Sequence, residues 1–369
     1  MLEWKKLGEV CSFNRGKTIT AKDACDGDVP VIAGGQTPSY FHNESNRTGE
    51  SITVAGSGAY AGFVSYWNQP IFVSDAFTVD PKGPMLHKYI FHWLKMNQQR
   101  IFATQKGAGV PHVHGKDIAN FEIPIPSITE QSRIVGILDT FTASIENLKQ
   151  QIAQRRKQYE HYRDQLLDLE GKEGVEMKML GEVCEIKGRI GFRGYTREDQ
   201  VAPGEGALSL SPGNIVNGKM DYSDSTYISW KKYEESPEIM VYEGDVLFCK
   251  TGSTVGKVAV ANDIPYKATI NPQLVVLKDV RIGPKYLYFY LTTPYIQKVV
   301  KALAGVGSVP NISQAKLGEL KILLPSLSEQ SRIVSILDTF EASIANLEQQ
   351  LAQREKQYEY YRNKLLKFD

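Results

Sequence analysis

The chain has 369 residues, with 43 Lys and Arg against 42 Asp and Glu and a formal net charge of +1, which is enough chain for two or three domains and excludes a uniformly basic coat. Its composition, 23% charged and 42% hydrophobic, excludes a disordered chain. No run approaches 18 apolar residues, and the four cysteines form no C-x-x-C pair, so we expect a cytoplasmic protein without a membrane span, disulfide framework or structural zinc site.

Residues 1–126 are predicted to form a first α+β domain. Short β-rich runs at 51–55 and 76–79 and a helical run at 87–98 mix strands with few helices. A basic loop and a glycine loop supply candidate DNA contacts through cationic, hydroxyl and aromatic side chains. The alternatives are a solvated loop and a tight β-turn. The candidates are Arg15, Lys17, Ser57 and Tyr60.

Residues 127–170 are predicted to form one long helix, with Ser127 or Thr129 as its N-cap. Apolar residues recur at alternating steps of four and three, which is the rhythm of a coiled coil, and Arg155 interrupts this stripe. A seam buried only within the chain is the alternative to a face that binds a partner. The late part of the helix is too polar for a sealed seam, so we expect a helical partner at Tyr159, Tyr162 and Arg163.

Residues 171–325 are predicted to form a second α+β domain, with strands at 245–249 and 273–277 and a helical run at 285–291. The glycine loop 250–257 resembles a phosphate-binding loop, but it has three residues between its glycines instead of four, and Val258 stands where Ser or Thr is needed, which argues against nucleotide binding. The candidate DNA contacts are Lys187, Arg189, Arg193, Tyr195, Arg197, Lys250, Thr251, Ser253, Thr254 and Lys257.

Residues 326–369 repeat the first helix. Across 126–167 and 325–366, 31 of 42 positions are identical, and the Leu-Gly-Glu-Val-Cys that begins at Leu7 recurs at Leu180. The second domain is 26 residues longer between these matches. The chain is therefore an internal pseudo-two-fold repeat of a variable domain and a nearly invariant helix. We expect the two helices to pair antiparallel and to link two globular domains, with Tyr358, Tyr361 and Arg362 facing a partner in the second copy.

The sequence gives no support for a catalytic centre or a metal. His112 and His114 correspond to Asn311 and Ser313 in the second copy and have no acidic or cysteine cluster with them, which argues against a metal pair. No nucleophile elbow, paired-carboxylate or dinucleotide motif is found. We therefore expect a chain that is non-catalytic by itself.

The repeated motif Pro-x-x-x-Glu-Gln-x-x-Ile-Val-x-x-Leu-Asp, at 126–139 and 325–338, resembles that of the specificity subunit of type I restriction–modification systems, over essentially the whole chain. The resemblance implies two target recognition domains, each reading one half of an asymmetric bipartite site in double-stranded DNA. It implies that the helices set the spacer and dock two modification subunits, and that restriction subunits join them. S-adenosylmethionine, ATP and Mg²⁺ are then expected on these partners, with no cofactor bound by this chain.

The residues by themselves leave two alternative functions to be weighed. One is a non-catalytic coiled-coil scaffold that binds other proteins through its globular ends. The other is a stand-alone restriction enzyme, against which the absence of catalytic motifs argues. A neighbouring methyltransferase gene would favour the specificity subunit over the scaffold.

Overall fold

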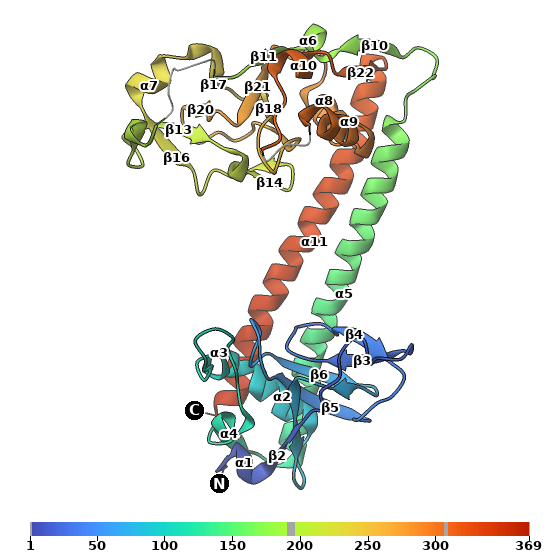
Figure 1. Ribbon diagram of the computed structural model, residues 1–369, viewed down its shortest axis with the longest axis vertical. Coiled ribbons are helices and arrows are strands. Elements are labelled where there is room, and N and C mark those ends of the chain that lie inside the picture. Colours follow the sequence, from blue (N-terminus) through green and yellow to red (C-terminus); the bar gives the residue numbers. More distant parts are fainter. Residues whose placement is uncertain (1, 190–195, 306–308, 369) are drawn as a thin grey trace. The chain divides into compact units, whose positions relative to one another are not determined.

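The computed structural model describes residues 2–189, 196–305 and 309–368 (Figure 1). The chain divides into two compact units, each taken by itself below. Unit 1 comprises Met1–Gln151 and Leu347–Asp369, and unit 2 comprises Ile152–Asn346. Each unit contains one α+β domain and a segment of both long helices. The predicted α+β class with two globular domains and two antiparallel helices is confirmed.

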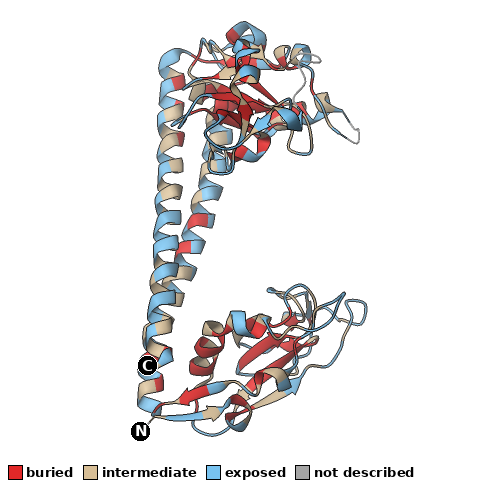
Figure 2. Ribbon diagram, turned by 90° about the vertical axis from the view of Figure 1, so that its left-hand side faces the viewer, coloured by how far each residue is buried: buried red, intermediate tan, exposed pale blue. Residues whose placement is uncertain are grey.

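The domain of unit 1 is built on a four-stranded antiparallel sheet in the order β2-β8-β5-β6. A smaller sheet has the order β4-β3-β7, and its β3 and β7 run parallel. Apolar side chains of the four-stranded sheet and of α2 form the main core, which Figure 2 shows as buried strands. The elements are β1 (Glu3–Lys6), α1 (Leu7–Val10), β2 (Cys11–Arg15), β3 (Val29–Ile32), β4 (Tyr40–His42), β5 (Glu50–Ala55), β6 (Val64–Asn68), β7 (Phe72–Val73), β8 (Ala76–Pro81), α2 (His87–Met96), α3 (Gln98–Phe102), α4 (Gly115–Ile118) and β9 (Glu122–Ile125).

The domain of unit 2 repeats this plan. Its main sheet has the order β11-β21-β18-β19, and its second sheet the order β12-β16-β13-β20-β17, again with one parallel pair, β13 and β20. The elements are β10 (Glu176–Met179), α6 (Leu180–Val183), β11 (Glu185–Lys187), η1 (Arg197–Asp199), β12 (Gln200–Val201), β13 (Gly206–Leu210), η2 (Pro212–Asn214), β14 (Ile215–Val216), β15 (Lys219–Met220), β16 (Thr226–Ser229), α7 (Trp230–Glu234), η3 (Pro237–Ile239), β17 (Met240–Val241), β18 (Val246–Cys249), β19 (Val258–Val260), β20 (Ala268–Ile270), β21 (Leu274–Lys278), α8 (Pro284–Leu291), α9 (Pro294–Ala304), α10 (Gln314–Gly318) and β22 (Lys321–Leu324).

The greater length of the second domain lies mainly between β13 and β18, where the chain forms η2, β14, β15, β16, α7, η3 and β17. The first domain has only β4 between the corresponding strands β3 and β5. The insertion therefore enlarges the second sheet and leaves the four-stranded sheet, which both domains share, unchanged in order. The short terminal strands match too, because β1 pairs antiparallel with β9 and β10 with β22.

The two long helices are α5 (Ile128–Leu167) and α11 (Leu327–Lys367). Ser127 and Ser326 are the N-caps, and their Oγ atoms accept hydrogen bonds from the backbone N–H of Glu130 at 3.2 Å and of Glu329 at 3.3 Å. Of the two caps expected for the first helix, Ser127 and Thr129, the structure therefore shows Ser127. Neither helix contains proline, so each runs unbroken through its full length.

Within each unit the helix segments pair antiparallel through aromatic contacts. In unit 1 the rings of Phe141 and Tyr361 stack with centroids 5.3 Å apart, and the Arg354 guanidinium lies 5.7 Å from the Phe141 centroid. In unit 2 Phe340, Tyr162 and Arg155 make the same contacts at 5.3 and 5.8 Å. The arginines that interrupt the apolar stripe therefore lie over phenylalanine rings, where a cation is favourable.

A glutamine fixes each helix to its own domain. The Gln131 side chain is 1% exposed; its Oε1 accepts from the backbone N–H of Leu86 at 3.0 Å, and its Nε2 donates to the carbonyl of Pro126 at 3.0 Å. Gln330 repeats these bonds with Gly283 and Pro325. The glutamine of the repeated motif thus has a structural reason, because buried backbone groups need partners.

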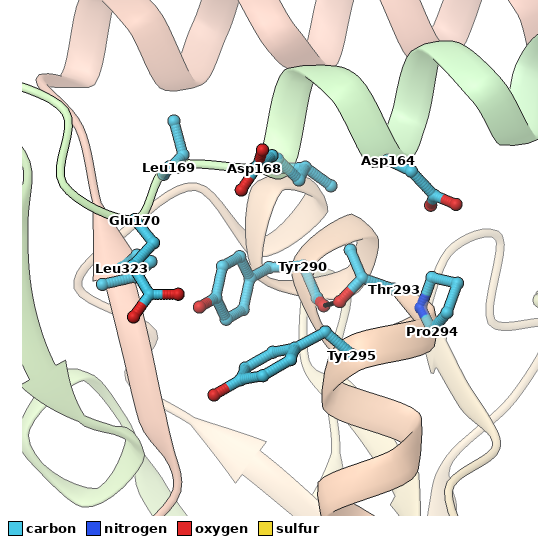
Figure 3. A pocket seen from close by; sticks show the side chains of 10 residues that line it. Asp164, Asp168, Leu169, Glu170, Tyr290, Thr293, Pro294, Tyr295 and Leu323 are labelled. Carbon is cyan, nitrogen blue, oxygen red and sulfur yellow. Dashed lines mark hydrogen bonds between the residues drawn. The ribbon is translucent and has the colours of Figure 1, made fainter.

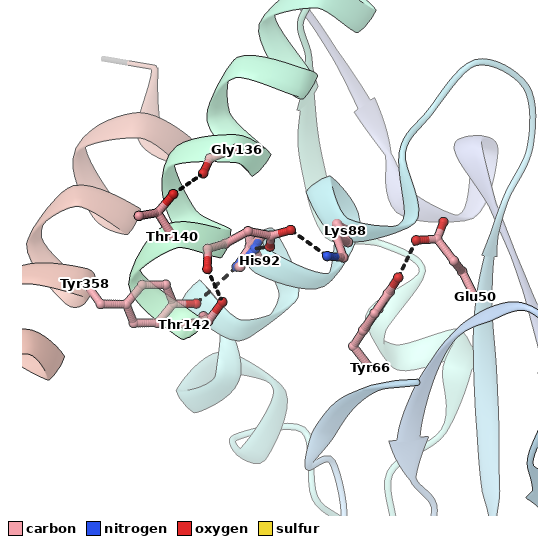
Figure 4. A network of polar contacts seen from close by, with 9 residues as sticks. Glu50, Tyr66, Lys88, His92, Gly136, Thr140, Thr142 and Tyr358 are labelled. Carbon is pink, nitrogen blue, oxygen red and sulfur yellow. Dashed lines mark hydrogen bonds and ion pairs between the residues drawn. The ribbon is translucent and has the colours of Figure 1, made fainter. Parts of the chain in front are cut away.

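A polar network joins α2 to both helix segments of unit 1 (Figure 4). The carboxylate of Asp139 on α5 accepts from Lys88 Nζ at 2.5 Å and pairs with His92 Nε2 at 2.9 Å, and the other ring nitrogen, Nδ1, lies 3.1 Å from the hydroxyl of Tyr358 on α11. Unit 2 keeps the lysine contact, Lys285 Nζ to Asp338 at 2.5 Å. The two helices are nearly identical in sequence, but the domains that they contact differ, because Phe289 stands in unit 2 where unit 1 has His92.

The corresponding region of unit 2 holds a carboxyl group in place of a threonine. Glu341 stands where the first helix has Thr142, and its Oε1 accepts from the hydroxyl of Tyr288 at 3.3 Å. Burial raises the pKa of Glu341 above its usual range, although the charge of Lys285 opposes the shift. The domain and the helix of this unit therefore share a contact that unit 1 does not have.

Candidate nucleic-acid interface

The same glycine turn follows the central strand of the main sheet in each unit. After β5, the backbone N–H of Gly58 donates to the carbonyl of Pro111 at 3.0 Å. After β18, the backbone N–H of Gly252 donates to the carbonyl of Pro310 at 2.9 Å. Pro111 and Pro310 each follow a valine, and both units therefore share one arrangement, in which the glycine turn is bonded to a downstream Val-Pro pair.

Glycine is required at the end of each turn. Gly62 has φ +91° and Gly256 has φ +94°, in the left-handed region that side chains disfavour. A Cβ on Gly256 would lie 2.5 Å from Gln297 Oε1. The amide Nε2 of Gln297 donates to the carbonyl of Gly256 at 2.8 Å, and Gln98 Nε2 donates to that of Gly62 at 2.8 Å. In each unit a glutamine side chain thus anchors the last glycine of the turn.

The turn of unit 1 borders a hollow of about 300 Å³. Two predicted contacts, Arg15 at the end of β2 and Ser57 in the turn, lie in its wall. The Ser57 hydroxyl donates a short hydrogen bond to the carboxylate of Asp75. The imidazole rings of His112 and His114 lie parallel with centroids 6.4 Å apart. The lining residues are Phe13, Arg15, Gly56, Ser57, Asp75, Ala76, Phe77, His112, Val113, His114, Gly115 and Lys116.

The other two predicted contacts of unit 1 lie outside this lining. Tyr60 projects from the turn and is 46% exposed. Lys17 follows β2, and its backbone N–H donates to the carbonyl of Val73 at 2.9 Å, while its side chain is exposed. The structure thus brings Arg15 and Ser57 into one hollow, while Tyr60 and Lys17 are exposed residues of the same turn and loop.

The turn of unit 2 is more tightly bonded. Thr251 Oγ1 donates to Asn311 Oδ1 at 2.6 Å, and Lys257 Nζ donates to the carbonyls of Pro212 at 3.3 Å and Ile215 at 3.0 Å. Burial lowers the pKa of the half-buried Lys250. The hydroxyl of Thr254 lies 3.5 Å from Cys249 Sγ. Only Ser253 of these five candidates is an exposed hydroxyl without a structural bond in the described chain.

The basic loop of unit 2 is only partly described. Arg193 and Tyr195 lie outside the described residues. Arg189 Nε donates to the carbonyl of Ile270 at 3.0 Å, and Lys187 Nζ pairs with Glu185 at 2.9 Å, whereas Arg197 is exposed at the start of η1. The terminal nitrogens of Arg189 are thus buried, whereas Lys187 forms a partly exposed ion pair. Their role toward DNA stays a prediction.

Sequence reasoning missed three residues of the unit 1 hollow. His112 and His114 were considered only as metal ligands, and among the described residues no group of three or more potential ligands is found. Asp75 was not singled out, because nothing in its neighbourhood along the chain marks it. Its place follows from β8, which brings residue 76 opposite Ala55 at the base of the turn.

The predicted partner-docking residues divide into two kinds. Tyr159 and Tyr358 are half-buried and pack against the core of their own units, and burial raises the pKa of both hydroxyls. Arg163 and Arg362 lie over these rings at 5.7 and 5.3 Å. Tyr162 and Tyr361 are 44% and 40% exposed beside the phenylalanines that they stack on. Of the six predicted docking residues, Tyr162 and Tyr361 are therefore the two whose rings are exposed enough to contact a further helix.

A separate pocket of about 320 Å³ lies in unit 2, where the end of α5 meets α8, α9 and β22 (Figure 3). Its polar groups include three carboxylates, Asp164, Asp168 and Glu170, and the exposed ring of Tyr295. Carboxylates repel phosphate, which argues against contact between this pocket and a DNA backbone. It holds none of the predicted contacts.

None of the described helices is long and apolar enough to cross a membrane.

Comparisons with known proteins agree on one family. The type I restriction modification DNA specificity domain matches residues 1–155 and 172–356. The type I restriction enzyme EcoR124I/EcoR124II specificity subunit of Escherichia coli is 29% identical, over 100% of this chain and 94% of its own. A putative type I restriction enzyme specificity subunit of Haemophilus influenzae is 27% identical, over 100% and 96%.

Two solved structures share the fold. The S subunit of a type I restriction–modification system from M. genitalium has a TM-score of 0.67 and 18% identity, covering 99% of this chain and 96% of its own. A chain from a structure of type I restriction–modification complex assembly has a TM-score of 0.60 and 20% identity, covering 99% and 97%.

Proposed function

Because this chain belongs to the family of type I restriction–modification DNA specificity subunits, we propose that its two domains each recognise one half of an asymmetric, bipartite site in double-stranded DNA. The observation that supports this division is the repeat itself. Both domains present the same sheet and the same glycine turn, but the side chains around the turn differ, with Ser57 and His112 in one and Thr251 and Asn311 in the other. Two different half-sites follow, because base edges are distinguished by the side chains that meet them.

The helices then have two roles in this proposal. As continuous elements of 40 and 41 residues, α5 and α11 set the spacer between the half-sites, since a helix holds a length that a flexible linker does not. Their nearly identical sequences provide equivalent docking sites for two copies of one partner, the modification subunit. The exposed rings of Tyr162 and Tyr361 are the docking residues that this proposal favours.

The chemistry belongs to the partners. Adenine methylation with S-adenosylmethionine is assigned to the modification subunits, and ATP- and Mg²⁺-dependent translocation and cleavage to restriction subunits, in the cytoplasm. This chain contributes selectivity, and no cofactor is assigned to it. Since its net charge is only +1, we expect much of the affinity for DNA phosphates to come from the assembled complex.

Mapping N6-methyladenine across a host genome tests this proposal. With the modification gene kept intact, deleting the gene for this chain should remove methylation from one bipartite motif, and restoring it should bring the same motif back. The intact host is the control. Every other methylated motif should be the same in the deletion strain as in this control. Methylation that is the same with and without the gene would favour the alternative of a coiled-coil scaffold.

A further inference from the structure

We propose that the hollow of unit 1 is a base-reading pocket, in which the carboxylate of Asp75 accepts a hydrogen bond from the exocyclic amino group of a cytosine or adenine, and that Gln273 occupies the same place in unit 2. This inference rests on the proposed function and adds to it the residues that distinguish the two half-sites. It is carried by strand register, by the contacts of the carboxylate and by the charges around it.

The two residues are equivalent by backbone geometry. Residue 76 pairs with Ala55 in β8–β5, and residue 274 pairs with Cys249 in β21–β18. Asp75 and Gln273 each stand immediately before those positions. The backbone N–H of Gly56 donates to the carbonyl of Asp75 at 3.0 Å, and that of Lys250 donates to the carbonyl of Gln273 at 2.9 Å. Both side chains are therefore presented at the base of the glycine turn.

The Asp75 carboxylate retains an acceptor for a ligand. Oδ2 takes the hydroxyl of Ser57, and in the described part of the chain no side chain or backbone group donates to Oδ1. The residue is half-buried in the wall of the hollow. A carboxylate has only acceptors to offer, so the group that it recognises must be a donor.

The surroundings identify that donor. Arg15 and Lys116 line the same hollow, and cations there suit the phosphates on either side of a base. A carboxylate would repel phosphate. It pairs instead with amino groups at base edges, of which cytosine N4 and adenine N6 are exposed in the major groove. The exposed imidazoles of His112 and His114 add further polar contacts at the rim.

Unit 2 offers different chemistry at this place. Gln273 carries an amide, which is held by Asn271: the Asn271 Nδ2 donates to Gln273 Oε1 at 3.2 Å, and the backbone N–H of Gln273 donates to Asn271 Oδ1 at 2.9 Å. An amide combines a donor with an acceptor and suits the N6 and N7 edge of adenine. The equivalent positions of the two half-sites are therefore read by different chemistry, a carboxylate in unit 1 and an amide in unit 2.

The test uses the assembled complex with Asp75→Asn and Gln273→Glu. Each variant is expected to relax the methylated motif at one base pair, Asp75→Asn in one half and Gln273→Glu in the other. On duplexes with that pair replaced, discrimination in methylation rate should fall about tenfold. Asn keeps the size of Asp and can still accept from Ser57, so the turn is preserved. An unchanged motif with unchanged discrimination would overturn the proposal.

Two further variants keep the result decisive. Asp26→Asn makes the same chemical change at an exposed carboxylate of unit 1 outside the hollow, and the motif should not change. If the Asp75→Asn complex does not assemble, His114→Ala, an exposed lining residue, replaces it, and an unaltered motif there overturns the proposal. A wild-type complex that methylates no motif would instead contradict the proposed function.

Discussion

Replacing Asp139 by Ala is expected to lower the free energy of unfolding of unit 1 by about 3 kcal/mol. The carboxylate accepts from Lys88 at 2.5 Å and contacts the ring of His92 at 2.9 Å, and the His92 side chain is 1% exposed. Removing it leaves a buried ring nitrogen without its partner, which costs more than the loss of a surface contact. Urea denaturation, with hydrogen exchange followed in α2, measures the effect.

The repeat supplies a matched control. Asp338→Ala removes the residue at the same position of the second helix, but its partner Lys285 is 42% exposed and the place of His92 is taken by Phe289. The expected loss is about 1 kcal/mol. Equal losses in the two variants would contradict the importance assigned to the buried histidine.

Acidification gives an independent readout of the same carboxylate. Burial is the largest influence on Asp139 and acts to raise its pKa. The hydrogen bonds from His92 and Lys88, with the electrostatic influence of both residues, together outweigh it, and the pKa of Asp139 lies below its usual range. Its contribution is therefore present above the unfolded value of about 4 and is lost as the pH falls through the folded value. The Asp139→Ala variant should show a smaller loss over this range than the wild type.

Gly256→Ala is expected to destabilise unit 2 by about 3 kcal/mol. The residue has φ +94°, and the added Cβ would lie 2.5 Å from Gln297 Oε1 and 3.3 Å from Val300 Cγ1. Moving the Gln297 side chain breaks its hydrogen bonds to the carbonyls of Gly256 and Leu291, both at 2.8 Å. The midpoint temperature of thermal unfolding and the affinity of the complex for its specific DNA site should both fall.

Gly244→Ala separates backbone strain from crowding. Gly244 has φ +85°, close to that of Gly256, but nothing lies within 4 Å of its added Cβ. Only the conformational cost of about 1 kcal/mol is expected. If Gly256→Ala lowered the free energy of unfolding no more than Gly244→Ala, the hydrogen bonds of Gln297 would not stabilise the turn as proposed.

The repeat made the long helices predictable from sequence. The spacing of apolar residues, the proline before each helix and the capping serines are local signals, and they agree with α5 and α11. The match between the two glycine turns rests on backbone bonds to Pro111 and Pro310, far along the chain, and only the structure shows it. Strand order was not predictable, because pairing such as β2 with β8 joins residues far apart in the chain.

The site was only partly predictable for the same reason. Cations and hydroxyls near glycine are visible in sequence, and so Arg15 and Ser57 were found. Asp75 was missed, since its relation to Ser57 exists only once β8 lies beside β5. The sequence also could not show that Lys257 donates to two carbonyls, which makes it a structural lysine as well as a candidate contact.

The central claim is that each domain recognises its own half of one DNA site. Exchange of residues 7–126 for the first domain of another family member, followed by mapping of N6-methyladenine in a genome, tests it most directly. One half of the methylated motif should change, while the other half and the spacer stay the same. A change in both halves, or in neither, would contradict the claim.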